Sequence, residues 1–139
     1  MAVVTSIMRL QQVFLASADA QLRPFGLTFA RYEVLMLLTF STNGALPLGK
    51  IGERLQVNAS SVTNAVDHLE AHGLVTRRPN PRDGRGTLAS ITAKGRRIAD
   101  LATRRMNAEV FGDVGLDARA LIGLLETLGR MRRAAGDFE

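Results

Sequence analysis

The sequence has 139 residues, a formal net charge of +5 and no cysteine. This length suits a single domain, and the lack of cysteine excludes disulfides, thiol-based redox sensing and cysteine-ligated zinc. No apolar run reaches the roughly 18 residues that cross a bilayer, and the first residues lack the pattern of a secretory signal. We therefore expect a cytoplasmic protein that does not enter a membrane.

Residues 3–22 have apolar side chains at every third or fourth position, which predicts an amphipathic helix. The Pro and Gly in residues 23–26 end that helix. Thr28 can cap a second helix, whose apolar interior predicts that it is buried. Residues 41–44 are interpreted as a loop.

The middle of the chain predicts a helix-turn-helix unit. Pro47 suits the first turn of a short helix that runs to Leu55. Asn58 is a candidate N-cap for the next helix, which we expect to stop near Gly73. The three residues between these helices match the length of a helix-turn-helix turn.

After this unit the pattern changes to a β-hairpin. Residues 74–78 and 87–91 are predicted as two short strands, with residues 79–86 as the loop between them. Thr92 can cap a long helix over residues 93–111, and Asp117 can cap the last helix of the chain. We therefore predict a mainly α fold with a small β-hairpin.

Basic residues are concentrated near this hairpin. Between Arg77 and Arg97 there are seven Lys or Arg side chains and one acidic side chain, Asp83. Such clustering is typical of a surface that binds phosphates, although a solvated charged face would have the same composition.

Several short motifs follow one another in order: Ile51-Gly52-Glu53-Arg54-Leu55, Ser61-Val62-Thr63-Asn64-Ala65-Val66-Asp67-His68-Leu69-Glu70, Gly73-Leu74-Val75, Asp83-Gly84-Arg85, Leu88, and Ile91-Thr92-Ala93-Lys94-Gly95-Arg96. The ordered set resembles the MarR (multiple antibiotic resistance regulator) family. The resemblance implies one domain over residues 1–139, with a winged helix-turn-helix core and long linking helix at 28–111. It also implies dimerisation helices at 1–24 and 112–139. The chain departs from the family pattern at Gln56, where Gly is frequent, and at Asn64 and His68, where basic residues are common.

The helix that begins at Asn58 is the candidate recognition helix, because an α-helix fits the major groove of B-DNA. Its hydroxyl side chains can meet bases or phosphates, and Asn64 can pair with adenine. In the hairpin, arginines suit a narrow minor groove; the resemblance implies that Asp83 braces the loop and that Arg85 enters the groove. The full set of expected DNA contacts is Lys50, Arg54, Ser60, Ser61, Thr63, Asn64, Arg77, Arg78, Arg82, Asp83 and Arg85.

The terminal helices carry more apolar surface than a compact winged helix needs, so they either complete a monomer core or pair two subunits. The resemblance implies a homodimer, with a candidate interface at Ile7, Leu10, Leu121, Leu124, Leu125 and Leu128. It also implies that a small aromatic or anionic effector releases DNA from a pocket near the dimerisation helices. Phe14 and Tyr32 are candidate pocket residues, although core packing would explain both.

The resulting hypothesis is a sequence-specific regulator, a repressor more often than an activator, on a pseudo-palindromic operator. Two alternatives remain: an architectural DNA-binding protein without an effector, and a winged-helix module that binds proteins. No catalytic motif is present, so no enzyme activity or cofactor is expected. We interpret His68 and His72 as surface histidines, because zinc needs three or four protein ligands.

Overall fold

The structure is a computed structural model that describes residues 1–137. Its α-helices are α1 (Ala2–Leu22), α2 (Phe29–Phe40), α3 (Leu48–Leu55), α4 (Ala59–Ala71), α5 (Ala93–Met106) and α6 (Ala118–Ala134). Short 3₁₀ turns cover Arg23–Phe25 and Thr42–Gly44, and a π-helical segment over Asn107–Phe111 continues α5. The strands are β1 (Ala45–Pro47), β2 (Val75–Asn80) and β3 (Asp83–Ile91).

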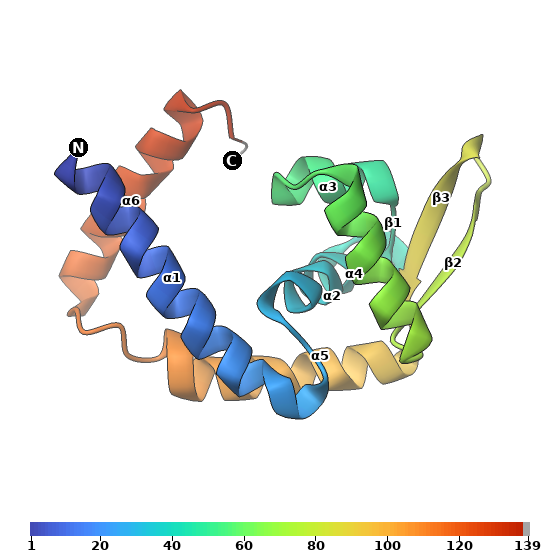
Figure 1. Ribbon diagram of the computed structural model, residues 1–139, viewed down its shortest axis with the longest axis horizontal. Coiled ribbons are helices and arrows are strands. Elements are labelled where there is room, and N and C mark those ends of the chain that lie inside the picture. Colours follow the sequence, from blue (N-terminus) through green and yellow to red (C-terminus); the bar gives the residue numbers. More distant parts are fainter. Residues whose placement is uncertain (138–139) are drawn as a thin grey trace.

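The elements separate into a lobe and a pair of terminal helices (Figure 1). The lobe holds α2, α3, α4 and an antiparallel sheet with strand order β1-β3-β2. Helix α5 runs beneath the lobe, and α1 and α6 rise on the side opposite the β2-β3 hairpin. This arrangement confirms the predicted winged helix-turn-helix fold with flanking terminal helices.

All four predicted helix caps are present. The side chains of Thr28, Asn58, Thr92 and Asp117 each accept a hydrogen bond from the backbone N–H three residues later. These bonds satisfy donors that the first turn of a helix leaves without a partner, and they explain why the helix starts could be read from the sequence.

Two features of the sheet differ from the prediction. Strand β1 was not predicted; it pairs with β3 through Ala45 and Ser90, and Pro47 ends it and precedes α3. The predicted loop over residues 79–86 is also wrong in extent, because strand pairing continues to Asn80 and Asp83. Pro and Gly suggested a loop there, but β2 is an edge strand, where proline is tolerated.

The departure at Gln56 has a conformational consequence. Gln56 ends α3 in the left-handed region, with φ of 56°. Glycine adopts this conformation without a steric penalty, which explains why glycine suits this position in the turn between α3 and α4.

The core lies between α2, α4 and α5. Val62, Val66 and Leu69 of α4 are buried, as their spacing predicted, and they share the core with Leu35 and Met106. In contrast, α6 has no buried residue, and α1 buries only Ala18 and Leu22. Among the described residues, no helix combines the length and the apolar character needed to cross a membrane.

Helix α5 meets the lobe at a glycine. Gly95 is buried, and a Cβ added to it would overlap the backbone oxygen of Leu74. The Thr92 hydroxyl donates to the Gly73 oxygen at 2.7 Å, so the end of α4 and the start of α5 are held together. A side chain at position 95 would therefore force α5 away from the lobe.

Gly95→Ala should lower the Tm, because overpacking against backbone costs about 1–3 kcal/mol. Gly49→Ala is the matched control: Gly49 lies in α3 with no neighbouring atom within 4 Å of an added Cβ. Alanine there should raise the Tm slightly through helix propensity. Thermal unfolding followed by circular dichroism measures both, and equal effects would contradict the close contact at Gly95.

Candidate nucleic-acid interface

The exposed face of α4 carries short polar side chains at its N-terminal end. Ser60, Ser61, Thr63 and Asn64 are exposed, opposite the buried face of the helix. The Ser60 hydroxyl donates to the Asn58 side-chain oxygen at 2.8 Å, which leaves its own oxygen available as an acceptor. Thr63 and Asn64 have no side-chain hydrogen bond to any other residue in the 1–137 range that the structure describes.

Side chains organise the tip of the β2-β3 hairpin. Asp83 Oδ1 accepts the Arg85 N–H, and Asn80 Oδ1 accepts the Arg82 N–H, both at 3.1 Å. Such bonds are typical of Asp and Asn in turns. Asp83 therefore contacts the backbone of the hairpin tip, and its role in bracing the loop against DNA stays a prediction.

The arginines of the hairpin differ in their partners. Arg78, Arg82 and Arg85 are exposed, and no ion pair to them is found within residues 1–137. Arg78 and Arg85 line an open hollow of about 430 Å³ on the hairpin. Three cationic side chains thus remain available for phosphates on this element.

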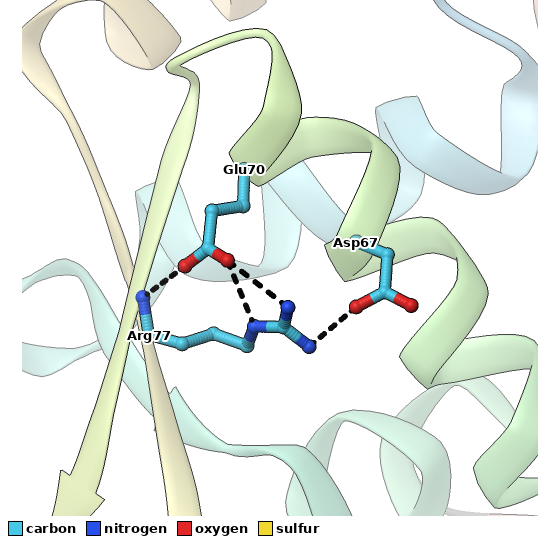
Figure 2. A network of polar contacts seen from close by, with 3 residues as sticks. All are labelled: Asp67, Glu70 and Arg77. Atoms are coloured by element: carbon cyan, nitrogen blue, oxygen red, sulfur yellow. Dashed lines mark hydrogen bonds and ion pairs between the residues drawn. The ribbon is translucent and has the colours of Figure 1, made fainter.

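Arg77 instead binds two carboxylates of α4 (Figure 2). Its Nη1 lies 2.5 Å from Asp67 Oδ1, and its Nη2 lies 3.0 Å from Glu70 Oε1. The Arg77 N–H also donates to Glu70 Oε2 at 2.9 Å. Hydrogen bonds from the Arg77 side chain and backbone lower the pKa of Glu70, and the hydrogen bond to Glu70 raises the pKa of Arg77.

Unlike the other hairpin arginines, Arg77 is therefore paired within the chain, and its guanidinium links β2 to α4. Sequence reasoning missed Asp67 and Glu70. The available signal was a pair of carboxylates three residues apart on one helix face, followed by an arginine at the start of a strand. Of the other predicted cations, Lys50 pairs with Glu53 at 3.0 Å and Arg54 is exposed.

A cavity of about 620 Å³ lies between α1, α2, the turn after α3 and the π-helical segment. Phe14 lines it, but Tyr32 does not, which corrects the expected placement of Tyr32. Tyr32 is buried against α5, and its hydroxyl lies 2.8 Å from Thr103 Oγ1. Sequence reasoning missed Glu33, whose signal was an acidic residue within an apolar helix.

The candidate dimer residues are accessible in the single chain. Ile7, Leu10, Leu121, Leu124 and Leu125 are exposed, and Leu128 is half-buried.

His68 and His72 stack with ring centroids 4.2 Å apart. Within residues 1–137, no group of three or more His, Cys, Asp or Glu side chains could hold a metal.

Glu70→Gln should lower the Tm at neutral pH, because the amide loses the charge that attracts Arg77. A lowered pKa means that Glu70 stabilises the fold above its usual value of 4.5 and that this contribution disappears as the pH falls through the lowered pKa. The Tm difference from wild type should therefore close in acid. Glu53→Gln, which removes a more exposed ion pair, should show little difference at any pH.

Comparison with known proteins identifies the family to which the chain is similar. The MarR family model matches residues 27–87. The crystal structure of Sco5413, a MarR family transcriptional regulator from Streptomyces coelicolor, is 53% identical, with a TM-score of 0.90, and the alignment covers all of this chain and 96% of that one. A structure of mutant MarR from E. coli with operator DNA has a TM-score of 0.85 at 22% identity and 94% coverage of both chains, which shows the fold.

The curated relative YdgJ, a transcriptional regulator of Bacillus subtilis, is 28% identical over 82% of this chain and 69% of its own length. Several other curated regulators align over about half of their length. The match to Sco5413 covers nearly the full length of both chains, so this chain belongs to the MarR family of transcriptional regulators.

Proposed function

We propose that this protein binds a pseudo-palindromic DNA operator as a homodimer and represses transcription of nearby genes. The observation that carries the proposal is the pairing of two elements. An exposed polar face on α4 lies beside a hairpin with three arginines free of ion pairs within the described residues, and the Arg77 bridge holds both.

Each element has a role that suits its shape. Ser60, Ser61, Thr63 and Asn64 read the major groove, where a bidentate Asn–adenine pair contributes discrimination. Arg85, with Arg82, enters the minor groove, which attracts arginine where it is narrow. Lys50, Arg54 and Arg78 contact phosphates, and Asp83 and Arg77 position the hairpin.

The solvent-accessible area supports the homodimer. The chain exposes 9441 Å², whereas a folded monomer of its mass exposes about 7,100 Å². The difference is of the size that a subunit buries in an obligate homodimer. The exposed apolar residues of α1 and α6 are the surface that we assign to this interface.

The cavity beside α1 is the proposed site for a small aromatic effector, because aromatic and aliphatic side chains form most of its lining. Binding, rather than catalysis, is the proposed activity, and the cytoplasm is the proposed location.

Capture of genomic fragments by the purified protein, followed by sequencing and footprinting, tests the function. We expect a few discrete sites with two half-sites about one helical turn apart. An architectural protein would give no discrete site, and a protein-interaction module would not shift duplex DNA even at low salt.

Arg85→Gln should make DNA binding less salt-dependent. The wild-type log–log slope should be roughly −5 or steeper, and losing one arginine per subunit should make it shallower by about 2. Arg104→Gln is the matched control: Arg104 lies in α5, pairs with Asp100 and is not one of the proposed DNA contacts, so the slope should stay the same. Fluorescence anisotropy across a salt series measures both. A slope unchanged by Arg85→Gln would show that the hairpin does not face DNA.

Leu124→Asp should dissociate the dimer and weaken operator binding, although α6, which contains Leu124, lies on the side opposite the hairpin (Figure 1). Sedimentation velocity gives the subunit state, and anisotropy gives the affinity. Glu126→Ala, on the same helix, is the control for a change that adds no buried charge. Wild type that sediments as a monomer at micromolar concentration yet binds a palindrome tightly would refute the proposed assembly.

A further inference from the structure

The cavity beside α1 contains one ionisable side chain. Glu33 of α2 lines it, together with the uncharged Gln11 and otherwise apolar residues, and no Lys, Arg or His is part of the lining. Glu33 is half-buried, and within residues 1–137 it has neither a hydrogen bond nor an ion pair from its side chain. A carboxylate placed in apolar surroundings without a partner destabilises the empty site.

Aromatic rings from three elements line the same cavity. Phe14 comes from α1, Phe29 from α2, and Phe111 from the π-helical segment. Such segments are rare and frequently occur at functional sites. Gly112 follows the segment, and a Cβ there would overlap the backbone oxygen of Asn107, so the backbone is closely packed where Phe111 is presented.

We infer that this cavity binds an aromatic cation, with the flat apolar part between the phenylalanines and an ammonium group paired with Glu33. The inference rests on the proposed effector site and specifies the chemistry of its ligand. A cation supplies the counter-charge that the lining lacks, and aromatic rings themselves attract cations. An aromatic carboxylate would instead place a second negative charge beside Glu33, with no basic side chain in the lining to balance it.

The same cavity connects the two parts of the proposed regulator. Phe14 belongs to α1, and Leu55 and Val57 belong to the end of α3 and the turn before the recognition helix. A ligand between them contacts both the proposed dimerisation helix and the DNA-reading unit. It can therefore change the spacing of two recognition helices by favouring one arrangement over another.

The test compares two probes of similar shape, 2-naphthylmethylammonium and 2-naphthoate, by calorimetry on the full-length protein at pH 7.5. We expect the cation to bind at least about tenfold more tightly than the anion. Glu33→Gln should remove most of this preference. Glu109→Gln changes the overall charge equally, but Glu109 is exposed and lies outside the lining, so it should leave the preference intact.

A second variant tests whether the cation binds in this cavity. Ala30 lines the cavity and is exposed, so Ala30→Trp should fill the space without disturbing the core and should abolish binding of the cation. Equal or tighter binding of the anion, no detectable binding of the cation, or cation binding that both variants retain would overturn the inference. DNA binding without any probe is measured separately, so failure here is distinguishable from failure of the proposed function.

The pH dependence provides an independent readout. Burial raises the pKa of Glu33 above its usual value of 4.5, and Glu33 is the only titratable group in the lining. The cation requires the ionised carboxylate, so its affinity should fall as the pH is lowered through this raised pKa. Glu33→Gln should make the affinity independent of pH over that range; an unchanged pH profile in this variant would contradict the pairing.

Discussion

The ion-pair bridge between Arg77 and α4 is the constraint on which the proposed DNA-reading surface depends. A recognition helix and a wing that enter neighbouring grooves need a fixed angle between them, because an error of a few ångströms at the hairpin tip would misplace an arginine. Arg77 supplies both a backbone and a side-chain contact to Glu70, with Asp67 as a further anchor. The two carboxylates hold Arg77 in place and leave the other hairpin arginines without an ion pair among the described residues, which suits the phosphate binding proposed for this surface.

The terminal helices, in contrast, lie largely outside the core of the lobe. The lobe has its own core, so α6 gains nothing from packing within the chain and buries no residue there. The exposed apolar residues of α6 are covered only if a second subunit packs against them. In the proposed dimer, the relative position of two lobes is set by helices that carry no DNA contact, and the cavity beside α1 lies where these two regions meet.

Local interactions could be predicted from the sequence, and long-range ones could not. The caps at Asn58 and Thr92 depend on residues three positions away, and the inner face of α4 depends on a helical repeat. By contrast, β1 has only three residues and forms because β3 offers an edge. The carboxylate partners of Arg77 lie seven and ten residues before it, and the cavity lining combines Phe14 with Phe111. Neither arrangement can be deduced without the three-dimensional structure.

The edge position of β2 has a consequence for how the protein behaves at high concentration. If the hairpin meets DNA as proposed, other parts of the chain cannot cover it, and an uncovered edge strand is a template for pairing with other molecules. In β2, Pro79 lacks the N–H that a new strand would need, and the exposed Arg78 adds positive charge to the same strand. The arginine-rich strand that suits phosphate binding thus also resists self-association into extended sheets.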